Sequence, residues 1–248
     1  MNQQRNAEEP ISLHALQVRN FRSLADVHLG FEPGVSVLVG RNAAGKSNIV
    51  DALRFVEDAL YDGVDFAVKS RGSRALLHRH RGRTARSFTI GLGFGSAALT
   101  AKYEITIAIN RAGDANISSE RIVGDVRERE RAAIDIHLKE GRFAKPKLST
   151  DTEQDLPSLD SKPYSLMLSV MGDSPLMARL IAHNLYNNKP EVIGDAARIV
   201  SDLSTFIGEM RFYHLFPNIM RSPKQPTGEV TLMNTFFRLP LILITNSI

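Results

Sequence analysis

Alternation of apolar and polar residues near the N-terminus predicts short strands. Residues 16–18 and 27–29 alternate on either side of a turn at 20–23, and a Pro-Gly pair at 33–34 marks a second turn. The run 35–39 is almost continuously apolar. Such a run is typical of a strand that is buried on both faces of a sheet.

The hydrophobic period lengthens after residue 46. Apolar side chains then recur at three- and four-residue spacings, at Ile49, Ala52, Leu53, Val56, Ala59 and Leu60. This stripe predicts an amphipathic helix over 46–60, which Asp62-Gly63 ends.

The period of two returns further along the chain. It is clear in 88–94 and 99–109, after which 110–114 has the composition of a hairpin turn and 134–138 reads as another strand. Because these strands follow one another without helices between them, they predict an antiparallel arrangement.

The second half of the chain predicts a different organisation. Residues 144–164 contain three prolines and an acidic stretch, and we interpret them as a linker or an ordered surface loop. Helices are expected over 175–187 and 190–210, and a strand over 212–216. The predicted divisions are a lobe at 1–143, the linker at 144–164, a helical region with its following strand at 165–228, and an apolar tail at 229–248.

The tail has an unusual composition. Between Val230 and Ile248 the only charged residue among 19 is Arg238. One interpretation is a truncated or frame-shifted reading frame, which we favour at this point. The alternative is an edge strand that packs on the core or on a partner.

Composition restricts the class of protein. With 248 residues, 43% hydrophobic and 23% charged, the chain is globular in composition and long enough to bury a core. It has no cysteine, which excludes disulfides, zinc–cysteine sites and thiol catalysis. The first ten residues are polar, and the longest apolar run, 239–244, is too short to span a bilayer. We therefore expect a soluble, cytoplasmic protein without a membrane partner.

Positive charge is concentrated in one segment. Residues 69–86 carry seven cations and no acid, so removing these seven charges from the net +4 leaves −3 for the rest of the chain. Such a segment could hold DNA or RNA phosphates, although it contains no aromatic residue for base stacking, and a solvated loop is the alternative. The nucleic-acid candidates are Arg71, Arg74, Arg79, Arg81, Arg83 and Arg86. We assign His78 and His80 to the same basic surface rather than to a metal pair.

One motif carries specific chemistry. The residues Gly40-Arg41-Asn42-Ala43-Ala44-Gly45-Lys46-Ser47 match the phosphate-binding (Walker A) pattern G-x-x-x-x-G-K-[ST]. Such a loop turns backbone N–H groups toward phosphates, and the helix that follows adds its positive end. Lys46 is expected to reach the β- and γ-phosphates, and Ser47 to bind Mg²⁺ through its hydroxyl. The predicted strand before the motif and helix after it make a chance glycine-rich turn a poor alternative.

Other classes of phosphate-loop protein fit less well. No Asp has Gly three positions later, and Asn188-Lys189-Pro190-Glu191 ends in Glu where a GTPase has Asp. A small-molecule kinase normally continues with alternating parallel strands and helices, whereas this sequence continues with consecutive alternating strands.

The N-terminal residues resemble a known family. The segment Leu16 to Leu24 with its NFRS turn, and Gly40 to Ser47 followed by the NIVDAL helix start, resemble SMC/RecF/OLD-type ATP-binding proteins, a branch of the ABC ATPases. The resemblance is firm to about Leu60 and weaker beyond it, where Tyr103 to Ile109, Glu120 and Phe212 to Pro223 agree loosely.

The resemblance implies an α/β P-loop NTPase fold, an ABC-type ATP-binding lobe with a mixed sheet, an antiparallel subdomain and a helical part. It also implies that ATP and Mg²⁺ are ligands. Nucleotide contacts would come from the residues of the loop, Asn42 among them, and also from Arg22 and Asn48. Arg22 as a solvated turn residue and Asn42 as a left-handed turn residue are the alternatives. The family commonly has Gly at the position of Ala43. If that position needs a positive φ, Ala costs about 1 kcal/mol.

Catalytic motifs of the family are not found in this sequence. Neither a signature segment, nor a Walker B strand ending in Asp-Glu, nor a switch histidine qualifies. The resemblance therefore implies the ATP-binding N-terminal portion of an ATPase in DNA repair or anti-phage defence. Its partners would be a second ATPase head (a second copy or a missing C-terminal half), DNA, or an effector nuclease. The alternative is a non-hydrolysing module that senses ATP or docks on another protein.

Overall fold

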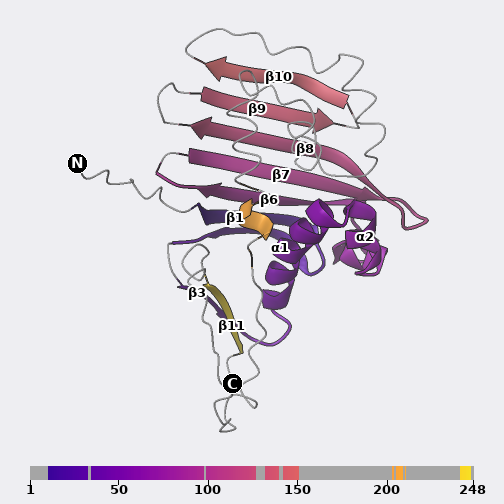
Figure 1. Cartoon of the computed structure of the whole chain (residues 1–248). Coiled ribbons are helices and arrows are strands. Elements are labelled where there is room, and N and C mark those ends of the chain that lie inside the picture. Colours follow the sequence, from indigo (N-terminus) through magenta and orange to yellow (C-terminus); the bar gives the residue numbers. More distant parts are fainter. Residues whose placement is uncertain are drawn as a thin grey trace, which may run out of the picture.

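A seven-stranded antiparallel sheet is the largest element of the computed structural model (Figure 1). The structure describes residues 11–32, 35–97, 99–126, 132–139, 142–150, 203, 205–208, 210 and 241–246. The strands of the sheet are β1 (Ser12–Phe21), β2 (Leu24–Gly30), β6 (Ser87–Gly95), β7 (Leu99–Ile109), β8 (Ala115–Val126), β9 (Ala132–Lys139) and β10 (Arg142–Thr150). They lie in the order β10-β9-β8-β7-β6-β1-β2, with every neighbouring pair antiparallel.

The sequence predicted most of this sheet. Strands β1, β2, β6 and β7 and the turn at 110–114 are confirmed, and the strand expected at 134–138 lies inside β9. Strands β8 and β10 were not predicted. Strand β10 contains a proline, but it is an edge strand and its register shifts between Ala144 and Lys147, at the place where Pro146 is tolerated. The sheet thus continues to Thr150, beyond the expected boundary at 143.

Two helices pack against part of the sheet and leave the end with β9 and β10 uncovered by them (Figure 1). Helix α1 (Lys46–Tyr61) packs on β1, and helix α2 (Val64–Lys69) packs on β8. Between α1 and the sheet, the rings of Phe21, Phe55 and Phe88 meet edge to face, with centroids 5.0 to 6.1 Å apart. All three side chains are buried. Helix α1 confirms the predicted amphipathic helix, because its apolar stripe is the surface that meets these rings.

The basic segment at 69–86 has regular structure, so the alternative that it is a solvated loop is wrong for most of its length. It contains the end of α2, a 3-10 helix η1 (Ser73–Leu76) and a hairpin of two short strands, β4 (Arg79–His80) and β5 (Arg83–Thr84). The turns of this segment are at Gly72 and at Arg81-Gly82, and we did not predict them because the interpretation rested on the charge of the segment.

The strand before the phosphate-binding motif differs from its prediction. Strand β3 (Val35–Gly40) pairs in parallel with β11 (Leu241–Asn246), apart from the large sheet. Val37 and Val39 are 49% and 67% exposed, so the expected burial on both faces is wrong for these residues. The reason is that β3 has only β11 as a neighbour within the described ranges. Strand β11 is part of the apolar tail, as the edge-strand alternative expects.

Little of the predicted helical region belongs to the described residues. Leu203 and residues 205–208 are helical, inside the helix expected at 190–210. Phe206 stacks on Phe94 of β6 with ring centroids 6.4 Å apart, which places this helical piece against the core. The linker beyond Thr150, the helix at 175–187, most of the helix at 190–210 and the strand at 212–216 lie outside the described residues. No helix in the described part is long and apolar enough to cross a membrane.

Candidate nucleotide-binding site

The phosphate-binding motif forms a tight turn between β3 and α1. The N–H of Ala44 donates to the carbonyl of Arg41 at 3.2 Å. Two residues of the turn have a positive φ, Ala43 at 63° and Gly45 at 92°. The position where the family commonly has Gly therefore does adopt the left-handed region, and Ala43 accepts the strain of an L side chain there. Asn42 does not adopt a positive φ, so its alternative as a left-handed turn residue is wrong.

Gly45 is favoured by its φ of 92° and also by the close approach of two side chains. A Cβ atom at this position would lie 2.9 Å from Ser23 Oγ and 3.0 Å from Leu24 Cδ2. Ser23 lies in the turn between β1 and β2, and Leu24 is the first residue of β2. The loop therefore lies directly against the NFRS turn. In the sequence, only the family resemblance connects this turn with the motif.

Lys46 folds back over the loop. Its side chain is buried, with 8% exposed, and Nζ donates to the carbonyls of Gly40 at 2.6 Å and Arg41 at 2.8 Å. An ammonium has three N–H donors. Two of them bind these carbonyls, and the third has no acceptor among the residues that the structure describes.

The start of α1 suits an anion. The first N–H groups of a helix have no intrahelical acceptor, and the helix dipole places partial positive charge at this end. Helix α1 has 16 residues and no acidic side chain in its first turn, so nothing there neutralises this charge. Ser47, in the same turn, is exposed. Buried ammonium, helix N-terminus and exposed hydroxyl together fit a phosphate chain with a divalent cation.

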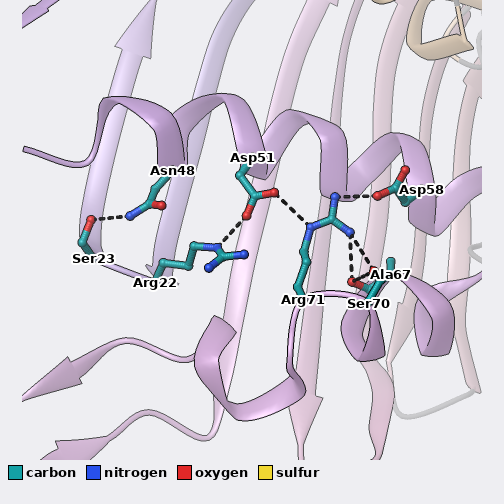
Figure 2. A network of polar contacts seen from close by, with 8 residues as sticks. All are labelled: Arg22, Ser23, Asn48, Asp51, Asp58, Ala67, Ser70 and Arg71. Atoms are coloured by element: carbon teal, nitrogen blue, oxygen red, sulfur yellow. Dashed lines mark hydrogen bonds and ion pairs between the residues drawn. The ribbon is translucent and has the colours of Figure 1, made fainter. Parts of the chain in front are cut away.

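Two further candidates lie beside the loop and already have protein partners (Figure 2). Asn48 Nδ2 donates to Ser23 Oγ at 2.7 Å, which ties the first turn of α1 to the turn between β1 and β2. Arg22 Nε donates to Asp51 Oδ2 at 2.5 Å. Arg22 itself has a φ of 51°, so its backbone is held in the left-handed region. Both side chains thus connect the turn between β1 and β2 to helix α1.

Arg71 is a structural residue, and its prediction as a nucleic-acid contact is wrong. Its side chain is only 10% exposed, and it pairs with Asp51 (3.0 Å) and Asp58 (2.5 Å) of α1 (Figure 2). Its guanidinium also lies 5.6 Å from the ring centroid of Phe55. Asp51 and Asp58 were not predicted as partners of Arg71, although their seven-residue spacing places them two turns apart on one face of a helix.

The other basic candidates remain on the surface. The side chains of Arg74, Arg79, Arg81, Arg83 and Arg86 are all exposed. Three of them belong to the hairpin β4–β5, which follows the segment that contacts the turn between β1 and β2. The stem of the basic hairpin and the phosphate-binding loop thus both contact the turn between β1 and β2.

Within the described ranges of the chain, no carboxylate cluster accompanies the loop. Among the described residues, no three His, Asp or Glu side chains are grouped so that they could hold a metal ion. Glu120 is fully buried and accepts a hydrogen bond from Tyr103 Oη at 2.6 Å. Burial, and then the charge of Glu120, raise the pKa of Tyr103 well above its ordinary 10.0. Glu120 thus lies in the core of the sheet, where its carboxylate binds the Tyr103 phenol.

Comparison with known proteins places these features in a family. The family model of the RecF/RecN/SMC N terminal domain matches residues 12–151. The DNA double-strand break repair Rad50 ATPase of Thermoplasma volcanium is 44% identical over 43 residues, 17% of this chain and 5% of that protein. The DNA replication and repair protein RecF of Lactococcus lactis is 37% identical over 46 residues, 18% of this chain and 13% of that protein. The chromosome partition protein Smc of Methanocaldococcus jannaschii is 36% identical over 77 residues, covering 30% and 6%.

Solved structures show partial likeness to the chain. The recombination mediator protein RecF, in a complex written RecF-ATPrS, has a TM-score of 0.32 at 24% identity, covering 44% of this chain and 27% of that chain. The Smc head domain of Pyrococcus furiosus bound to the C-terminal domain of ScpA has a TM-score of 0.33 at 20% identity, covering 54% and 30%. The matched region thus spans about a third or less of the relatives' lengths.

Proposed function

Because the chain belongs to the RecF/RecN/SMC N-terminal domain family, whose model matches residues 12–151, we propose that it binds ATP at the loop Gly40–Ser47. In this proposal the chain is the nucleotide-binding part of an ATPase that acts in DNA repair or chromosome maintenance. The curated relatives support this assignment, since they are repair and chromosome-partition proteins and their matched segments are short parts of them.

One observation carries the proposal. Lys46 is buried, yet it points back over the loop and donates to the Gly40 and Arg41 carbonyls instead of pairing with a carboxylate in the described part of the chain. A buried cation without a paired carboxylate is costly unless an anion compensates it. A triphosphate at the N-terminus of α1 would supply that anion.

Mg²⁺ would be held by Ser47 and by the nucleotide. Because the described residues offer no carboxylate cluster, the cation would take most of its oxygen ligands from phosphate and water. When bound, Mg²⁺ neutralises charge on the terminal phosphates. The chain's own contribution is to orient the phosphate chain through Lys46 and the first-turn N–H groups of α1.

Isothermal titration of the purified chain tests the proposal. We expect binding of ATP in the presence of Mg²⁺ and weaker binding with a chelator. Ser47→Ala should remove most of the Mg²⁺-dependent difference, whereas Ser87→Ala at the start of β6 should leave it unchanged. Absence of ATP binding by a chain that is folded by circular dichroism would contradict the proposal.

A second ATPase head is part of the same proposal. Arg41, Asn42, Ala43, Ala44 and Ser47 are exposed, so the nucleotide would remain open to solvent on this side. A second head that covers it could supply the water-positioning carboxylate that hydrolysis needs. We therefore expect ATP-dependent self-association by light scattering, and turnover near background wherever the chain stays monomeric. Rapid turnover by the monomer would contradict this part.

A further inference from the structure

The hairpin β4–β5 carries Arg79, Arg81 and Arg83, which form no ion pair with any residue that the structure describes. Arg79 pairs with Thr84 and His80 with Arg83 across the hairpin, and Arg81 and Gly82 form its two-residue turn. Both turn residues have a positive φ, 47° and 78°, as a type I′ turn requires. The turn chemistry defines a ribbon with a fixed shape rather than a solvated loop.

Cations occupy both faces and the tip of this ribbon. Directly opposed residues share a face, so Arg79 lies on one face with Thr84, and Arg83 lies on the other with His80. Arg81 is at the tip. All three arginines are exposed, and no acidic residue occurs between 69 and 86.

Nearby acids are already paired with other cations. Asp51 and Asp58 bind Arg71, and Asp65 binds Lys69 at 2.6 Å. These three carboxylates therefore have cation partners outside the hairpin.

The base of the hairpin is fixed to the rest of the fold. His78 N–H donates to the Asn20 carbonyl at 2.9 Å, and its ring Nδ1 lies 2.8 Å from the Arg22 carbonyl. The Arg22 N–H donates to the Leu76 carbonyl at 2.7 Å, and Ala85 N–H donates to the His78 carbonyl at 2.9 Å. The backbone of the stem is therefore fixed before a ligand binds, which lowers the backbone ordering entropy that opposes binding.

We propose that the hairpin β4–β5 is a contact surface for double-stranded nucleic acid, entering a groove between two rows of phosphates. A ribbon with cations on both faces suits a groove with anionic walls on both sides, and the major groove of DNA admits a two-stranded ribbon. A bilayer surface is one flat anionic plane, and elements that lie in it bury apolar side chains at the acyl boundary. The tip here is Arg-Gly. The hairpin also has no Phe, Tyr or Trp side chain on which the bases of a single strand could stack.

Fluorescence anisotropy with a labelled DNA duplex, on the full chain without nucleotide, tests the inference. Because no ATP is present, the result is independent of binding at the phosphate loop. Replacement of Arg79, Arg81 and Arg83 together by Ser should weaken duplex binding at least about tenfold. It should also flatten the slope of log affinity against log salt by about 2 to 3. The single charge reversal Arg81→Glu should act in the same direction.

A charge-matched control separates the hairpin from net charge. Arg19, Lys102 and Arg121 lie exposed on strands of the large sheet, and their replacement by Ser removes three cations elsewhere. We expect this variant to retain most of the duplex affinity. An equal loss in both triple variants, or an unchanged salt slope in the hairpin variant, would overturn the inference.

Three further probes decide the ligand class. Binding to a single-stranded oligonucleotide should be weaker than to the duplex and should depend less on the hairpin. Hairpin-dependent binding that is tighter to phosphatidylserine vesicles than to the duplex would overturn the inference in favour of a membrane. Poly-glutamate that competes as well as unlabelled duplex would overturn it in favour of an acidic protein surface.

Discussion

Arg22 and Asp51 form an ion pair, with Nε and Oδ2 2.5 Å apart, that ties the turn between β1 and β2 to helix α1 (Figure 2). The same carboxylate binds Arg71 at 3.0 Å through its other oxygen. Asp51 lies one helical turn beyond Ser47 of the phosphate-binding loop. The position of the loop relative to the large sheet therefore depends on a carboxylate that is shared by two guanidinium groups.

Asp51→Asn should destabilise the fold because it removes the charge that both arginines share. Hydrogen bonds to charged groups contribute about 1.5–3 kcal/mol, and partial exposure of the pair favours the lower end. Thermal or urea unfolding measures the change. Asp65→Asn breaks the exposed pair with Lys69 and should cost less than about 1 kcal/mol. Equal effects of the two substitutions would show that the shared carboxylate has no special weight.

Lys46→Ala should weaken ATP binding by at least about tenfold, since it removes charge-assisted hydrogen bonds worth roughly 1.5–3 kcal/mol each. Titration calorimetry measures the affinity. Lys102→Ala removes an exposed ammonium on β7 and should leave the affinity unchanged. The same affinity for both variants would exclude Lys46 from the phosphate site.

Ala43→Gly should stabilise the loop, because Ala43 holds a φ of 63° that glycine adopts without steric cost. The gain is limited to about 0.5–1 kcal/mol by the greater freedom of glycine in the unfolded chain. Ala44, next in the loop, is not among the residues with positive φ, and Ala44→Gly should be neutral or destabilising. Unfolding free energies that rank the two variants in the opposite order would refute this reading of the loop.

Tyr103→Phe should destabilise the core by about 1–3 kcal/mol, because it leaves Glu120 buried without the phenol donor. A double-mutant cycle with Glu120→Gln should show a coupling between the two side chains. Additive effects in that cycle would mean that the hydrogen bond contributes little.

Stability should also fall in alkaline solution. Burial raises the pKa of Tyr103 in the folded protein, and the charge of Glu120 raises it further, so folding favours the neutral phenol. This contribution is fully present below the unfolded pKa of 10.0 and is lost as the pH rises toward the folded value. The unfolding temperature measured against pH above about 10 should therefore fall less steeply in Tyr103→Phe than in the wild-type chain.

Much of the fold and of the candidate site could be predicted from the sequence, because local patterns encode them. The loop at 40–47 and helix α1 follow from a contiguous motif and a period near 3.6, and the strands β6 and β7 follow from strict alternation. The sequence even indicated the cost at Ala43, since a φ preference belongs to a single residue.

Only the tertiary structure decided how these pieces meet. Asp51 binds Arg22 and Arg71 across separations of 29 and 20 residues, and no period in the sequence marks such pairs. The pair with Asp51 holds the Arg71 side chain where it is mostly buried. Arg79, Arg81 and Arg83 belong to the same basic run but are exposed. Likewise, Val37 and Val39 are as apolar as a buried strand requires, but their exposure depends on which strands lie beside β3. Hydrophobicity and charge fix what a residue prefers, whereas burial and pairing depend on neighbours that arrive from distant parts of the chain.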